Sequence, residues 1–78
     1  MIKILIIDDH PLVCDGIKTM LKDEPSMEVV NASKTATEAL SFLSNHEPDI
    51  ILLDISLPDM NGLELCERIR TMNKKVKI

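Results

Sequence analysis

Two short apolar runs, each ended by aspartate, limit what this chain can fold into more than any other feature of the sequence. Residues 2–7 read Ile-Lys-Ile-Leu-Ile-Ile and stop at Asp8 and Asp9. Residues 50–53 read Ile-Ile-Leu-Leu and stop at Asp54. Apolar runs without a polar alternate position are typical of strands that are covered on both faces of a parallel sheet. The sequence therefore predicts buried parallel strands that end in carboxylates.

Three segments with helical periodicity separate the apolar runs. Pro11 suits a first helical turn, Thr35 with Glu38 forms a capping-box pattern, and Asn61 precedes the third segment. Their apolar residues recur at helical spacing in three groups: Leu12, Val13, Ile17, Met20 and Leu21; Ala36, Ala39, Leu40 and Leu43; Leu65, Cys66, Ile69 and Met72. With weaker strand-like runs at 28–30 and 76–78, the order is βαβαβαβ, which predicts an α/β fold with a parallel sheet.

Composition excludes several classes of function. The 78 residues include 13 acidic and 9 basic side chains, a net charge of −4, which argues against a basic face for nucleic acid. Phe42 is the only aromatic residue, so no base-stacking platform can form, and the two cysteines, Cys14 and Cys66, lack zinc-knuckle spacing. No apolar run approaches the ~18 residues of a membrane span, and no signal-peptide pattern opens the chain. We expect one cytoplasmic domain with no membrane contact.

The aspartates become a candidate site if the strands that precede them are neighbours. In open α/β sheets, ligands bind outside the carboxyl ends of the strands. Alone, Asp8 and Asp9 would be a helix cap, and Asp54 a turn residue. Together, three converging carboxylates would strongly raise at least one pKa unless a cation neutralised them. A hard divalent cation such as Mg²⁺, bound by oxygen ligands and water, is the natural occupant.

The residues after Asp54 complete a specific motif. Residues 54–62 read Asp-Ile-Ser-Leu-Pro-Asp-Met-Asn-Gly, which fits a tight loop that leads into a helix. With the Ile-Asp-Asp that ends the first run and the Leu-Leu-Asp that ends at Asp54, the whole chain resembles the receiver domain of two-component response regulators. The resemblance implies a doubly wound, flavodoxin-like parallel sheet with strand order 2-1-3-4 in the part present. In that order the first and third strands are neighbours.

The resemblance also implies a role for each position of the motif. Asp54 corresponds to the phosphoacceptor, Asp9 to a direct Mg²⁺ ligand and Asp8 to a ligand that acts through water. Ser56 would supply its main-chain carbonyl as a further Mg²⁺ ligand. A sensor histidine kinase would donate the phosphoryl group from a phosphohistidine. The expected chemistry is self-phosphorylation and self-dephosphorylation of a switch, and not that of a metabolic enzyme.

The chain also departs from the family pattern. A receiver has about 120 residues, whereas this chain stops at Ile78, before the family's Thr or Ser and its Lys. We therefore expect residues 1–78 to be the N-terminal part of a receiver, marginally folded alone or self-associated through an open sheet edge. Residues 7–17 are similar to receivers that precede a LuxR-type helix-turn-helix domain. DNA would then be bound by a downstream domain of a transcription regulator, outside this chain.

Two other functions fit part of the pattern. A phosphohydrolase of the haloacid-dehalogenase type also uses an aspartate nucleophile with Mg²⁺, but it requires Asp-x-Asp, and Ser56 stands at the second position. A receiver-like interaction module that never accepts phosphate remains open because the family's Lys is absent, although the three aspartates speak against it. His10 lies beside the acidic pair, where it could be a ligand or a base, but it is interpreted as a solvent-facing residue that starts the first helix.

Overall fold

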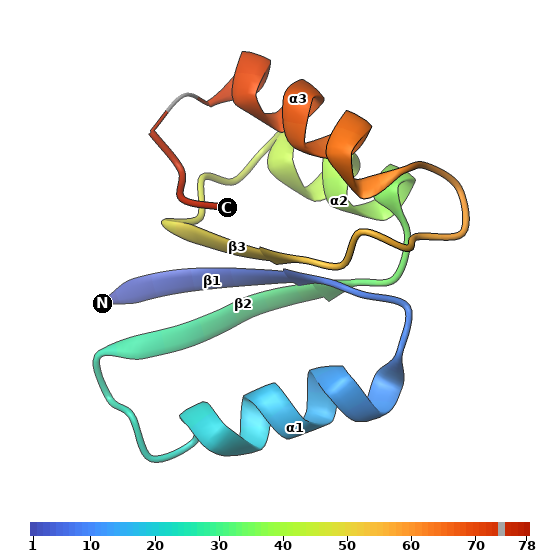
Figure 1. Ribbon diagram of the computed structural model, residues 1–78. Helices are drawn as coiled ribbons and strands as arrows, with labels where there is room; N and C mark the ends of the chain where they lie inside the picture. The colour runs from blue at the N-terminus through green and yellow to red at the C-terminus, as the bar shows by residue number, and fades with distance from the viewer. Residues whose placement is uncertain (74) are drawn as a thin grey trace.

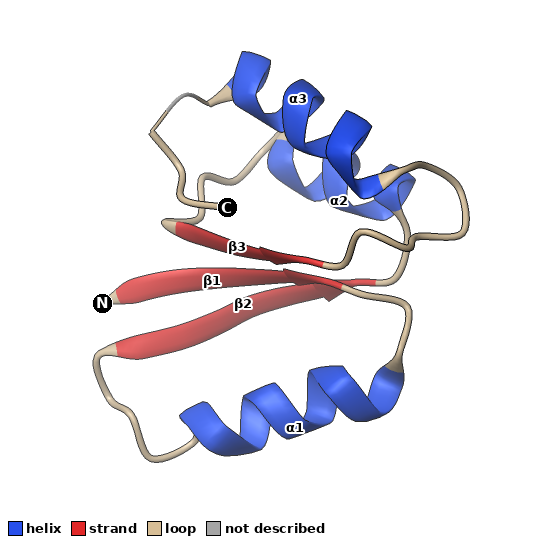
Figure 2. Ribbon diagram, in the orientation of Figure 1, coloured by secondary structure: helices blue, strands red, loops and turns tan. Residues whose placement is uncertain are grey.

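The computed structural model describes residues 1–73 and 75–78 (Figure 1). Strands and helices alternate along the chain: β1 (Ile2–Ile7), α1 (Pro11–Leu21), β2 (Met27–Ser33), α2 (Ala36–Leu43), β3 (Ile50–Leu53) and α3 (Gly62–Met72). The strands form one parallel sheet in the order β2-β1-β3. Helix α1 covers one face of the sheet, and α2 and α3 cover the other (Figure 2). The predicted doubly wound α/β fold is confirmed.

Strand β1 lies in the centre of the sheet and sets the position of both neighbours. Its last residue, Ile7, pairs with Ser33 of β2 and with Leu53 of β3. The pairing with β2 shifts register between Ile4 and Leu5, whereas the pairing with β3 is regular. The carboxyl ends of the three strands therefore meet at one edge of the sheet.

The expected fourth strand needs a correction. The 76–78 run lies beside β3, as the order 2-1-3-4 requires, but it forms a single parallel bridge between Lys77 and Ile50 and no strand. The Ile51 N–H donates to the Lys77 carbonyl (2.7 Å), and the Lys77 N–H donates to the Asp49 carbonyl (3.1 Å). A ladder needs several successive pairs, and only the middle residue of this three-residue run is paired. Val76 nevertheless joins the core.

Apolar side chains of the central strand, β1, pack on both faces of the sheet. Leu5 and Ile7 pack toward α2 and α3, in a cluster with Ala36, Ala39, Ile51, Leu65, Ile69 and Val76. Ile4 and Ile6 point to the opposite face, where they pack with Cys14 of α1. Successive residues of a strand face opposite sides, and both sides are covered here. This double coverage explains why the run contains no polar alternate position between Ile4 and Ile7.

The buried face of α1 differs from the predicted stripe. Leu12 is 86% exposed and Met20 is 79% exposed, whereas Cys14 is buried. Ile17 and Leu21, three and seven positions after Cys14, pack beside it against the sheet. Apolar residues cover more than one side of this helix, so periodicity alone did not define the side that faces the sheet.

The predicted helix starts are confirmed. Pro11 occupies the first position of α1, and the Thr35 hydroxyl accepts a hydrogen bond from the Glu38 N–H at the start of α2 (3.1 Å). The Asn61 side chain caps α3 through the Leu63 N–H (2.7 Å). Among the described residues, none of these helices combines the length and apolar character that a membrane crossing requires.

The two glycines allow a matched test of packing at the start of α3. A Cβ on Gly62 would lie 2.5 Å from Ile55 Cα and 2.9 Å from the Asp54 carbonyl oxygen. Gly62→Ala should therefore destabilise the fold by about 1–3 kcal/mol, the usual cost of overpacking. A Cβ on Gly16 of α1 would meet nothing within 4 Å, so Gly16→Ala should stabilise by about 0.5–1 kcal/mol through helix propensity.

Urea denaturation of both variants measures this difference. A Gly62→Ala variant as stable as the parent would show that the backbone of Asp54 and Ile55 yields to the added methyl group at no cost.

Candidate functional site

The sheet fixes the backbone of the aspartates that follow β1 and β3. The Asp54 N–H donates to the Ile7 carbonyl (2.9 Å), and the Asp8 N–H donates to the Ser33 carbonyl (2.9 Å). The parallel ladders thus continue one residue beyond the strands on both sides of β1. The sheet therefore holds the backbone of Asp8 and Asp54 at one edge, and Asp9, which follows Asp8, joins them in one cluster, as the sequence predicted.

The two ends of the loop between β3 and α3 are hydrogen-bonded to each other beside Asp54. Ser56 and Asn61 form an antiparallel bridge, and the Gly62 N–H donates to the Ile55 carbonyl (2.9 Å). The Ser56 N–H donates to Asp54 Oδ1 (3.0 Å). The loop backbone therefore contacts the Asp54 carboxylate directly, and it brings Ser56 to the edge of the cluster.

The imidazole of His10 reaches all three carboxylates. Its Nδ1 atom lies 2.5 Å from Asp8 Oδ1, 3.1 Å from Asp9 Oδ1 and 3.4 Å from Asp54 Oδ2. One ligand atom from each of these four side chains lies within 4.8 Å of every other. The sequence interpretation of His10 as merely solvent-facing missed this contact. Its side chain is 60% exposed, yet the ring nitrogen faces the acidic cluster.

The donor set fits a hard divalent cation. Asp9 Oδ1 is buried and accepts no hydrogen bond in the described part of the chain, although His10 Nδ1 lies 3.1 Å away. A buried carboxylate oxygen without a partner is costly unless a cation or water reaches it. Three carboxylates at one edge, with the backbone of Ser56 beside them, could supply the oxygen ligands that Mg²⁺ prefers.

Hydrogen bonds from His10 govern the charge of the cluster. Burial raises the pKa of Asp8, but hydrogen bonds from the His10 side chain and backbone outweigh this effect and leave the pKa below its ordinary value. The pKa of His10 is raised, first by its hydrogen bond to Asp8 and then by the charge of Asp9. When it is protonated, the imidazole is a counter-charge for the carboxylates.

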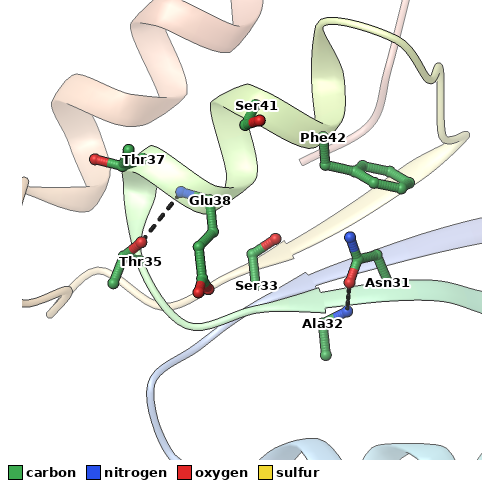
Figure 3. Close-up of a pocket in the computed structure, with 8 residues that line it drawn as sticks. All are labelled: Asn31, Ala32, Ser33, Thr35, Thr37, Glu38, Ser41 and Phe42. Carbon is green, nitrogen blue, oxygen red and sulfur yellow. Dashed lines mark hydrogen bonds between the residues drawn. The ribbon is translucent and has the colours of Figure 1, made fainter.

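The carboxylates of Asp8 and Asp54 border an open hollow of about 390 Å³. Asp8, His10 and Asp54 form its polar side, with Ile6, Ile17, Leu52 and Leu53 beside them. A second hollow of about 590 Å³ lies between β2 and α2 (Figure 3) and contains none of the three aspartates. The buried Ser33 hydroxyl, without a partner among the described residues, lies at its base. Of these two hollows, the first is the one that the clustered aspartates border.

Comparison with known proteins gives consistent relatives. The sequence model of the response regulator receiver domain matches residues 4–78. The DNA-binding transcriptional activator DevR/DosR of Mycobacterium tuberculosis is 38% identical over 66 residues, which are 85% of this chain and 30% of that protein. The chain spans about a third of the length of the curated relatives it matches.

Solved structures agree with the sequence relatives. A CheY-like receiver domain protein from Methanospirillum hungatei superposes with a TM-score of 0.89 at 38% identity, over 99% of this chain and 60% of that one. A LuxR-family two-component response regulator from Aurantimonas superposes with a TM-score of 0.85 at 31% identity, over 95% of this chain and 53% of that one.

The contact between His10 and Asp8 predicts a pH dependence. The pKa of His10 should lie above its ordinary 6.5 when no divalent ion is present. Because the folded value is raised, the contribution of His10 to stability is complete below that ordinary value and is lost as pH rises through the folded value. Asp8→Asn should bring the His10 pKa down toward 6.5, as followed by NMR of the ring protons.

Asp49→Asn is the control. This aspartate accepts the Lys3 N–H at the start of β1, whereas the acidic cluster follows the end of β1, so the His10 pKa should not change. A His10 pKa that stays the same in Asp8→Asn would show that the 2.5 Å contact does not form in solution.

Proposed function

The chain belongs to the response regulator receiver domain family, and we propose that it accepts a phosphoryl group on Asp54 in a phosphorelay. The observation that carries this proposal is the meeting of Asp8, Asp9 and Asp54 at one sheet edge. Asp54 is 22% exposed in its side chain, so a donor can reach the carboxylate. Residues 1–78 would then form the N-terminal part of a receiver domain.

The proposed reaction is attack by a carboxylate oxygen of Asp54 on the phosphorus of a phosphohistidine. The new O–P bond forms as the P–N bond breaks, and the departing imidazole keeps the electron pair of that bond and takes a proton. Water later hydrolyses the acyl phosphate and restores the carboxylate. Ser56 orients the nucleophile, because its N–H binds Asp54 Oδ1. Its small side chain leaves access for the water.

Asp9 and Asp54, with the main-chain carbonyl of Ser56, would hold Mg²⁺ directly, and Asp8 would act through water. When bound, the ion would offset the negative charges of Asp54 and of the phosphoryl oxygens. The buried Asp9 Oδ1 atom without a hydrogen-bond partner among the described residues supports its place as a ligand. His10 would have to leave its position among the carboxylates as the cation enters.

The partners follow from the family. We propose a sensor histidine kinase as the phosphoryl donor, a cytoplasmic location for this chain, and a transcription regulator as the protein to which this domain belongs. The relatives include proteins that are named a DNA-binding transcriptional activator and a LuxR-family response regulator. DNA would be bound by a downstream domain, and this chain would act as the switch that controls it, without enzymatic activity on other substrates.

The acceptor assignment predicts the result of a labelling experiment. Incubation of the full-length protein with a small phosphodonor and Mg²⁺ should add one phosphoryl group that is labile to base and to hydroxylamine, and Asp54→Asn should abolish it. Intact-mass spectrometry measures the addition. Asp23→Asn, an exposed change in the turn after α1, is the matched control and should be labelled like the parent.

Labelling of Asp54→Asn to the parent level would place the acceptor elsewhere. Turnover of phosphate monoesters by the parent would instead favour the phosphohydrolase alternative.

The metal assignment predicts an order of affinities. Asp9→Asn and Asp54→Asn should each weaken Mg²⁺ binding more than Asp8→Asn, because they remove direct ligands and Asp8 acts through water. Calorimetric titration of the full-length protein measures the affinities, with Asp23→Asn again unchanged. If Asp9→Asn binds Mg²⁺ as tightly as the parent, Asp9 is not a ligand.

A further inference from the structure

Asp59 joins the β3–α3 loop to a helix far away in the sequence. One carboxylate oxygen accepts the N–H of Ala36 (2.8 Å). The other accepts both the N–H of Thr37 (3.0 Å) and its hydroxyl (2.8 Å). These three hydrogen bonds satisfy donors at the start of α2, 22 and 23 residues away. The loop is therefore fastened to α2 at its tip.

The fastened loop is the same one that carries Ser56. At its base, Ser56 pairs with Asn61 and donates its N–H to Asp54 (3.0 Å). Gly62 packs closely against the backbone of Asp54 and Ile55. The base is thus set by β3 and α3, whereas the tip is held to the rest of the molecule by Asp59. Without the three bonds at the tip, the contacts at the base alone would hold the backbone of Ser56 beside Asp54.

We propose that Asp59 is a positioning residue for the cation site, because it holds the loop to α2 and thereby fixes Ser56 beside Asp54. The inference rests on the proposed function insofar as Ser56 supplies a ligand carbonyl. Loss of a partner that orients a direct ligand typically weakens metal affinity, because the ligand is then held less exactly in place. The sequence motif places Asp59 only in the loop, and topology brings it to α2.

The hydrogen bonds of Asp59 are additional to the cap that α2 has within its own segment. Helix α2 already has its own cap, since the Thr35 hydroxyl accepts the Glu38 N–H (3.1 Å; Figure 3). Figure 3 also shows the hydroxyl of Thr37 pointing away from Phe42 and from the hollow between β2 and α2. The pKa of Asp59 is lowered, chiefly by the Ala36 N–H and the Thr37 hydroxyl, which agrees with a carboxylate that is held in place.

The pair Asp59→Ala and Thr35→Ala tests the proposal in the full-length protein. Both variants remove hydrogen bonds from the first turn of α2, but only Asp59→Ala releases the loop. Asp59→Ala should weaken Mg²⁺ binding about 10–100-fold, the usual effect of losing a partner that orients ligands. Thr35→Ala should lower the melting temperature without changing Mg²⁺ affinity. Asp59→Asn, which keeps one acceptor oxygen, should fall between the parent and Asp59→Ala.

A second measurement does not depend on metal. Hydrogen exchange of the Ser56 amide, recorded without divalent ions, should be faster in Asp59→Ala than in the parent and unchanged in Thr35→Ala. Equal Mg²⁺ affinity and equal Ser56 exchange in Asp59→Ala and the parent would overturn the proposal. So would an equal loss of affinity in Thr35→Ala and Asp59→Ala. Failure of the proposed function would instead appear as labelling that survives Asp54→Asn, with the Ser56 exchange result unaffected.

Discussion

The parallel pairing of β1 with β3 is the constraint on which the rest of this structure depends. The pairing of Ile7 with Leu53 brings the residues after both strands to one edge, and these residues are acidic. Two full charges 4 Å apart repel by about 4 kcal/mol at an effective dielectric constant of 20. The carboxylates remain together because their backbone continues the hydrogen-bond ladder of a buried sheet. The repulsion leaves the cluster ready to bind a cation.

Burial of β1 on both faces supplies the stability that tolerates this repulsion. Leu5, Ile6 and Ile7 are almost completely buried, and each buried side chain of this size contributes about 1.5–3 kcal/mol. Their positions immediately before Asp8 and Asp9 leave the strand end little freedom to move the charges apart. In its protonated form, His10 supplies a counter-charge from the start of α1. The same strand, β1, therefore contributes side chains to the core and ends at the acidic cluster.

The sequence predicted those parts of the structure that depend on local pattern. The runs ended by Asp8 and Asp54 gave β1, β3 and the convergence of the carboxylates, because strand ends in a parallel sheet share an edge. The buried face of α1 was not predictable from periodicity, since apolar residues such as Leu12 lie on more than one side of the helix. His10 was missed because an exposed residue can still turn its ring nitrogen toward an acidic cluster.

Asp59 shows why contacts between distant segments escape a reading of the sequence. Nothing in the loop motif indicates that this carboxylate binds α2, because the contact exists only once β3 and α2 have been placed on the sheet. Hydrogen bonds at the strand ends hold the backbone of Asp8 and Asp54, whereas Ser56 belongs to a loop. When some ligands of a site come from strands and others from a loop, the geometry of the site depends on how firmly the loop is held to the rest of the fold. In this protein, Asp59 supplies that attachment at the tip of the loop.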